Sequence, residues 1–146
     1  MPSARKPAAS ADPEEDQVIP VLPGEDPWTP EELAEIREEL HEEAARMRHA
    51  IGVAEAELVG LLRDTAEGAG RDPADVGSSN FERDQEMSLA HNAREMLDQV
   101  QLALRMLDNG QYGSCESCGR PIGKARLQVF PRATMCVACK QREERR

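Results

Sequence analysis

Four cysteines are the residues of this 146-residue chain whose spacing indicates the clearest chemistry. Cys115 and Cys118 form one C-x-x-C pair, Cys136 and Cys139 form a second, and 17 residues separate the two pairs. Each pair places two thiolates on one tight turn, so two pairs can surround one Zn²⁺ tetrahedrally. A redox C-x-x-C motif would not require a second pair. We therefore expect one zinc ion, with iron–sulfur ligation as the alternative.

Four protein ligands leave no open coordination position, and a closed zinc site holds structure without activating water. The three histidines, His41, His49 and His91, are distant from the cysteines in sequence and are expected on helix surfaces. The sequence shows no nucleophile–base pair, no phosphate-binding glycine loop and no carboxylate pair set in a pocket. We therefore do not expect an enzyme.

Charge is divided unevenly along the chain. Residues 1–110 carry 10 basic and 25 acidic side chains (net −15), and residues 111–146 carry 8 and 3 (net +5), which gives the total of −10. An acidic body repels phosphate, so direct DNA binding is not expected to be the main function. The basic end is either a contact surface for phosphate or acidic protein, or a solvated helix terminus.

No apolar run approaches the about 18 residues of a membrane span, and no signal peptide is recognisable. A cytoplasmic location follows, where thiols stay reduced and paired cysteines favour metal over disulfides. Residues 1–28, rich in Pro, Ala, Asp and Glu, are expected to form a disordered tail. Its apolar residues around Pro20 are either a docking peptide or, as we favour, an unstructured spacer.

A long helix is expected to begin at Thr29-Pro30-Glu31-Glu32, where Thr29 and Glu32 make a capping box and Pro30 suits the first helical position. Apolar residues then recur at heptad spacing in two columns, interrupted only by Arg37. The columns are Leu33, Leu40, Met47, Ala54 and Leu61, and Ala44, Ile51 and Leu58.

Residues 67–80 are expected to form a loop, and a second helix is expected over about residues 80–109, ended by Asn109-Gly110. Its apolar stripe is Ala90, Ala93, Leu97, Val100, Leu104 and Leu107. Two such stripes joined by a short loop predict an antiparallel coiled-coil hairpin about 45 to 55 Å long. The alternative is a bundle or homodimer in which a third partner covers the stripe.

The predicted fold is therefore mainly α. A disordered acidic, proline-rich tail (1–28) precedes a coiled-coil hairpin (29–110, with tip loop 67–80). A four-cysteine zinc-finger module with a short C-terminal helix follows (111–146).

The cysteine segment resembles a known family. The run Tyr112–Gly119, with Ile122, Arg126-Leu127, Pro131 and Cys136–Lys140, is similar to the DksA/TraR family of four-cysteine zinc-finger proteins. Upstream, Asp72–Asp75 followed by Phe81–Asp84 resembles the acidic tip and second-helix start of that family. The likeness extends over about residues 30–146.

The resemblance implies a regulator of bacterial RNA polymerase. Members bind the enzyme and insert the hairpin into its secondary channel, where tip acids act near the catalytic Mg²⁺ and modulate initiation. On this chain the matching acids are Asp72 and Asp75. Read from the residues alone, both could instead serve only the turn, because Asp before Pro commonly opens one. The free protein is expected to be a monomer.

Some family members bind guanosine tetraphosphate through basic residues, and the match here is incomplete. Residues 87–110 contain only Arg94 and Arg105 as basic side chains, and Phe130 occupies a position that is often basic. Lys140 is the one residue that carries over. We therefore expect this nucleotide to bind weakly, or only together with the polymerase.

Two other functions remain open on the sequence. One is a nucleic-acid-binding zinc module, with Arg120, Lys124, Arg126 and Arg132 as its surface. The other is a structural coiled-coil adaptor. Retention on a nucleic-acid column at low salt would support the first, and oligomerisation would support the second.

Overall fold

The computed structural model describes residues 18–67 and 73–146, with the side chains of residues 65–67 and 75 left out. It contains four helices: α1 (Pro30–Glu67), α2 (Pro73–Asp108), α3 (Lys124–Val129) and α4 (Val137–Glu144). The described residues form no strand, only an isolated bridge between Ser114 and Pro121. The prediction of a mainly helical fold with a C-terminal helix is confirmed, and α3 is an additional short helix.

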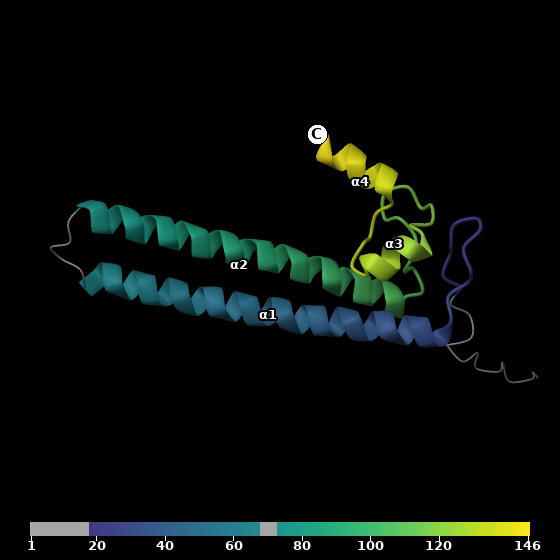
Figure 1. Ribbon diagram of the computed structural model, residues 1–146, viewed down its shortest axis with the longest axis horizontal. Coiled ribbons are helices and arrows are strands. Elements are labelled where there is room, and N and C mark those ends of the chain that lie inside the picture. The colour runs from purple at the N-terminus through teal and green to yellow at the C-terminus, as the bar shows by residue number, and fades with distance from the viewer. Residues whose placement is uncertain (1–17, 68–72) are drawn as a thin grey trace, which may run out of the picture.

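Helices α1 and α2 lie side by side and antiparallel as a long hairpin (Figure 1). The start of α1 carries the predicted capping box: Thr29 Oγ1 accepts a hydrogen bond from the Glu32 N–H at 3.2 Å, and Glu32 Oε1 accepts one from the Thr29 N–H at 3.1 Å. This reciprocal pair satisfies two donors that a helix start leaves open.

The hairpin core is concentrated at the end that carries the cysteines. Leu40, Val100 and Ala103 are fully buried there, and Ala44 is 1% exposed. Ile36, outside the predicted columns, is buried where Arg37 interrupts them, and Arg37 instead pairs with Asp108 at 2.6 Å.

Toward the tip, the α2 side of the seam is polar. Ser79, Arg83 and Glu86 are half-buried there, while Phe81 and Met87 are exposed. Polar side chains offer little apolar area to α1, so the hairpin packs more weakly in this half.

The predicted tip loop was too long. Helix α2 begins at Pro73 and not near residue 80, so Gly77 and the polar run Ser78–Asn80 are helical. Proline is well suited to the first helical position, because its fixed φ is helical and its missing N–H is not needed there. Gly77 and the polar residues after it each lower helix stability by about 1 kcal/mol or less, which is too little to end a helix that continues for many turns.

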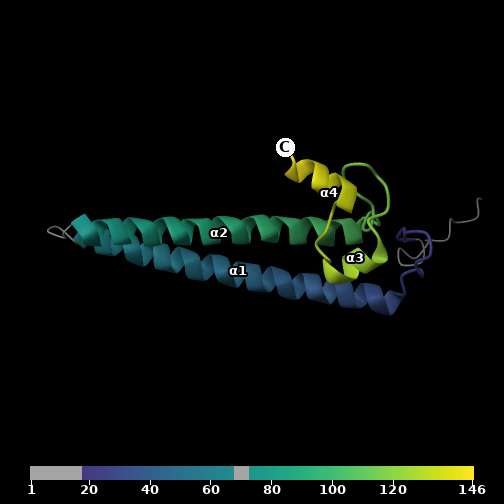
Figure 2. The same ribbon diagram turned by 45° about the horizontal axis from the view of Figure 1, so that its top comes forward.

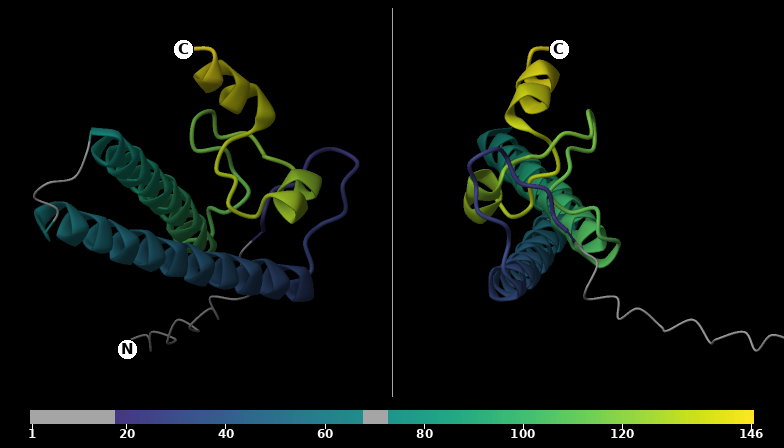
Figure 3. Two further views of the ribbon diagram at one scale, coloured as in Figure 1. Left: turned by 60° about the vertical axis from the view of Figure 1, so that its left-hand side comes forward. Right: turned by 90° about the vertical axis from the view of Figure 1, so that its right-hand side faces the viewer.

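The interpretation of residues 18–28 as part of a disordered tail was wrong, while residues 1–17 lie outside the described part of the chain. Residues 18–29, here called the N-terminal strap, run beside α3 (Figure 3). Ile19 is 6% exposed, and its Cγ2 lies only 2.5 Å from where a Cβ on Gly113 would stand. Leu22 packs in the same way against Gly123. Both glycines have positive φ, so both positions require the absence of a side chain.

Residues 111–146, here called the cysteine module, are folded over the base of the hairpin, with α4 projecting away from it (Figure 2). Tyr112, Ile122 and Leu127 are buried with the hairpin residues in one core. Tyr112 also donates a hydrogen bond from its hydroxyl to the Pro131 carbonyl at 2.7 Å, which ties together the segments that lead into the two cysteine pairs.

Candidate metal centre and hairpin tip

The fold brings the four predicted ligands together. The Sγ atoms of Cys115, Cys118, Cys136 and Cys139 all lie within 4.8 Å of one another, and those of Cys118 and Cys136 are 3.7 Å apart. Because Zn–S bonds are about 2.3 Å long, thiolates in a tetrahedral site lie about 3.8 Å apart. None of the four is in a disulfide. The donor set and its spacing therefore fit one Zn²⁺.

Local backbone geometry explains how each pair forms a knuckle. The Cys115 N–H donates to the Arg120 carbonyl at 2.8 Å, and the Gly119 N–H returns to the Cys115 carbonyl at 2.9 Å. Gly119 has a φ of 76°, which closes this turn without steric cost. The second pair uses a helix start: extended Cys136 immediately precedes α4, and Cys139 lies in its first turn.

The surroundings of the four cysteines shift their thiol pKa values in different directions. Burial raises the pKa of the Cys115 thiol, but backbone N–H groups of Cys118, Cys136 and Ser117 outweigh it and lower that pKa to about 6. The Cys136 pKa is also lowered, chiefly by the Cys139 N–H. A hydrogen bond with Cys136, together with burial, raises the pKa of Cys139 to about 12. Metal binding would displace the proton that Cys139 retains.

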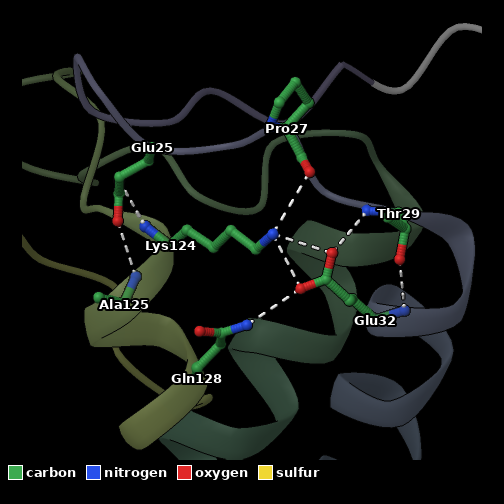
Figure 4. Close-up of polar contacts among 7 residues, drawn as sticks. All are labelled: Glu25, Pro27, Thr29, Glu32, Lys124, Ala125 and Gln128. Carbon is green, nitrogen blue, oxygen red and sulfur yellow. Dashed lines mark hydrogen bonds and ion pairs between the residues drawn. The ribbon is translucent and has the colours of Figure 1, made fainter.

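The strap fastens the cysteine module to α1 through one carboxylate. Glu25 Oε1 accepts a hydrogen bond from the backbone N–H of Lys124 at 2.9 Å, and Oε2 accepts one from that of Ala125 at 2.9 Å (Figure 4). Within the strap, Oε1 also accepts a hydrogen bond from the backbone N–H of Leu22 at 2.8 Å. Lys124 and Ala125 open α3, whose first N–H groups have no partner within the helix. Glu25 thus caps a helix that begins 99 residues later.

Lys124 completes this connection from the other side. Its Nζ lies 2.8 Å from Glu32 Oε2 and donates to the Pro27 carbonyl at 3.3 Å (Figure 4). The same Nζ stands 5.4 Å from the centre of the Trp28 ring. The Lys124 side chain is only 13% exposed. Gln128 donates a further hydrogen bond to Glu32 at 3.0 Å. The capping residue of α1 is therefore also the anchor of the module.

These contacts alter the candidate nucleic-acid surface. Two of its four cations are occupied inside the protein, because Lys124 pairs with Glu32 and Arg132 pairs with Glu43. Arg126 lies against the Phe130 ring, with 5.9 Å between the guanidinium carbon and the ring centre. A phosphate backbone would meet these cations already neutralised or stacked, which counts against the nucleic-acid alternative.

A groove of about 1060 Å³ runs between α2 and the cysteine module. Its lining includes the cations Arg105, Arg126 and Lys140 and the apolar residues Leu102 and Phe130. Acidic residues, among them Asp98 and Glu116, line it as well. This mixed lining is less cationic than the surroundings that a highly charged nucleotide requires.

Of the two predicted tip acids, Asp72 lies outside the described residues. Asp75 lies in the first turn of α2. That turn is at the end of the hairpin opposite the cysteine module (Figure 1). The hairpin therefore separates residue 75 from the metal centre by nearly the length of α2.

Comparison with known proteins agrees with this architecture. Residues 110–145 match the family described as prokaryotic dksA/traR C4-type zinc finger. The solved structure of transcription factor DksA2 from Pseudomonas aeruginosa has 31% sequence identity and a TM-score of 0.60, over 75% of this chain and 81% of that one. The chain belongs to the DksA/TraR family. The prediction from the cysteine motif and tip sequence is thereby confirmed.

Curated DksA/TraR relatives are similar over a shorter stretch. The RNA polymerase-binding transcription factor DksA of Caulobacter vibrioides is 43% identical over 75 residues, which are 51% of this chain and 53% of the relative. The protein of the same name from Escherichia coli K12 is 32% identical over 69 residues, 47% and 46% of the two chains. The chain thus spans about half the length of these curated relatives. In the described part of the chain, no helix is long and apolar enough to cross a membrane.

The strap is the functional element that the sequence interpretation missed. Its signal was the apolar island that includes Ile19 and Leu22, which was interpreted as a spacer. The two glycines on which these side chains rest, Gly113 and Gly123, lie about a hundred positions away. The sequence of the strap itself does not indicate that Ile19 and Leu22 pack against these glycines.

Proposed function

We propose that this protein is a transcription regulator that binds bacterial RNA polymerase and inserts its hairpin tip into the secondary channel to modulate initiation. Two curated relatives bear the name RNA polymerase-binding transcription factor. The observation that carries the proposal is the rod itself: α1 has 38 residues and α2 has 36, a length of about 55 Å at 1.5 Å per residue. A rod of this length can hold its tip far from the cysteine module.

In this mechanism Asp72 and Asp75 are effectors and not anchors. Carboxylates placed beside the catalytic Mg²⁺ and basic groups of the polymerase change the electrostatic potential there. They can also contact the mobile elements of the polymerase that close on substrate. Helix α2 presents residue 75 in its first turn, so its position is fixed by the hairpin. The protein is then not an enzyme itself, because it acts on the active site of another.

The cysteine module holds one structural zinc ion in this proposal. Cys115, Cys118, Cys136 and Cys139 supply four ligands, which leave no position for substrate or water. The bound metal supplies a rigid crosslink between the two knuckles. The chain's own residues fix that crosslink to the strap through Glu25, to the hairpin through Lys124, and within the module through Tyr112.

We further infer a monomeric, cytoplasmic protein with little or no response to guanosine tetraphosphate. Leu40 and Val100 are already fully buried within a single chain, so no second copy is needed to cover them. In the groove, Phe130 offers a ring where a phosphate would need a cation.

The decisive experiment removes charge from the tip and nothing else. Asp72→Asn/Asp75→Asn preserves side-chain size, and zinc content and polymerase affinity should remain nearly unchanged. Regulation of a short-lived open complex, measured with purified polymerase, should be largely lost. A double variant that regulates as well as the parent would make these acids turn residues only. Loss of polymerase binding would make them anchors. Crosslinking from position 75 to polymerase gives an independent test of the insertion.

A further inference from the structure

A cationic side chain of α4 is directed at the four-cysteine cluster. Arg142 follows Cys139 by three residues, and its Nη2 donates a hydrogen bond to the Cys139 Sγ at 3.9 Å. Residues three apart share one face of a helix, and helix side chains lean toward the N-terminus, so α4 turns this guanidinium back toward its own first cysteines. Cys139 is only 6% exposed. A permanent positive charge therefore stands beside a buried sulfur.

This arginine has no carboxylate partner. Among the described residues, none lies within ion-pair distance of Arg142, although Glu143 and Glu144 follow it directly. Four other cations of the cysteine module pair with a glutamate or lie against an aromatic ring: Lys124, Arg126, Arg132 and Lys140. A cation in the last turn of a helix is favourable in itself because of the helix dipole. That effect does not depend on where the side chain points, whereas the contact with Cys139 does.

The charge of a loaded site explains what this contact can do. Four thiolates outweigh one Zn²⁺ by two negative charges, and a buried charge is costly unless it is compensated. At Cys115, three backbone N–H groups supply hydrogen bonds to the sulfur. At Cys139, side chains are donors: the Ser117 hydroxyl and the Arg142 guanidinium. Of these two side chains, only the guanidinium brings a full positive charge.

We propose that Arg142 is a positioning residue of the metal centre, whose guanidinium donates to the zinc-bound Cys139 thiolate and so retains the metal. The proposal rests on the zinc site proposed above and does not depend on polymerase binding. A donor to a ligating sulfur takes up part of its negative charge and fixes its orientation. Loss of such a partner typically lowers metal affinity about 10- to 100-fold.

The first test measures the zinc affinity of the full-length protein by competition with a chelating dye. Arg142→Gln should weaken zinc binding about tenfold or more. Arg142→Lys keeps the charge but loses the planar fork of donors, so its affinity should lie between the two. Arg145→Gln is the matched control, because Arg145 is the exposed C-cap residue of the same helix and its loss changes the net charge equally. It should bind zinc as the parent does.

Cobalt substitution separates a contact with the sulfur from a general effect on α4. Co²⁺ bound by the four thiolates gives a sulfur-to-metal charge-transfer band in its absorption spectrum. Removal of the guanidinium raises the energy of the Cys139 lone pairs, because a charge-assisted hydrogen bond no longer stabilises them. The band should therefore move to longer wavelength in Arg142→Gln, move less in Arg142→Lys, and stay in place in Arg145→Gln.

The outcomes distinguish this proposal from the metal site on which it rests. A parent that binds neither zinc nor cobalt would contradict the site itself. If the parent binds both, the role of Arg142 is refuted by any of three results while the site stands. These are an unchanged affinity and band in Arg142→Gln, equal losses in Arg142→Gln and Arg145→Gln, or a lower affinity with an unmoved band. Should Arg142→Gln fail to load metal, the same two measurements on Arg142→Lys decide.

Discussion

Glu25 accepts a hydrogen bond from the backbone N–H of Lys124 at 2.9 Å, across 99 residues of sequence. The same Lys124 reaches back with its side chain to Glu32, at the start of α1. Strap, cysteine module and hairpin are therefore joined at one residue, through its backbone on one side and its ammonium group on the other.

Glu25→Gln should loosen this junction. The substitution replaces one carboxylate oxygen by an NH₂ group that faces a backbone N–H, so one acceptor is lost and a donor meets a donor. We expect a lower melting temperature and a changed emission of Trp28, the single tryptophan, which lies beside Lys124. Asp26→Asn, at the next and exposed position, should change neither. Identical emission in Glu25→Gln and the parent would mean that the strap is not held by this carboxylate.

The junction should also depend on pH. The N–H groups of Ala125, Lys124 and Leu22 lower the pKa of Glu25 below its ordinary value of 4.5. The hydrogen bond from Lys124 lowers the pKa of Glu32 in the same direction. A carboxyl with a depressed pKa in the folded state contributes fully above its unfolded pKa and loses that contribution as the pH falls. Emission of Trp28 should therefore be constant above about pH 5 and change below 4.5. A transition centred near neutral pH would contradict this assignment.

Removal of the metal should melt the module and spare most of the hairpin. Structural zinc contributes on the order of 10 to 16 kcal/mol in small modules, and residues 111–146 have few core side chains to replace it. Cys118→Ser or a strong chelator should leave most of the circular dichroism of α1 and α2 intact and should expose Tyr112. Metal analysis should give one zinc per chain. A chain without zinc after reduced purification would refute the site.

The hairpin should be most sensitive to substitution at its cysteine-module end. Leu40 is fully buried, so Leu40→Ala should lower the free energy of unfolding by about 2 to 5 kcal/mol. Leu62, 48% exposed nearer the tip, provides the matched control, and Leu62→Ala should cost well under 1 kcal/mol. Chemical denaturation of the zinc-loaded proteins measures both. Equal costs would show that packing is uniform along the rod.

Guanosine tetraphosphate should bind the isolated protein weakly. The groove beside Phe130 combines the cations Arg105 and Lys140 with the acids Asp98 and Glu116, so the attraction for phosphate is largely cancelled. Calorimetry at moderate salt should give a dissociation constant in the high micromolar range or above. Tight binding would overturn this expectation, and Phe130→Arg should strengthen whatever binding is seen.

The spacing of the cysteines, the capping box at Thr29 and the heptad columns predicted the four-cysteine cluster and the hairpin without reference to any structure. These signals are local: a knuckle spans a few residues, and a helix repeats every few residues. The beginning of α2 was mistaken because Gly77 and its polar neighbours are local breakers, and a long helix begun at Pro73 overrides their small individual costs.

Only the tertiary structure decided which residues serve the module from outside it. Glu25 appeared to be a tail acid, and Lys124 appeared to be a surface cation. Their roles depend on partners about a hundred residues away in the sequence. A helix cap and an ion pair between distant elements are properties of relative position in space. Sequence periodicity carries no information on how separate elements are docked, because docking is set by the sum of many weak contacts formed only once the chain has folded.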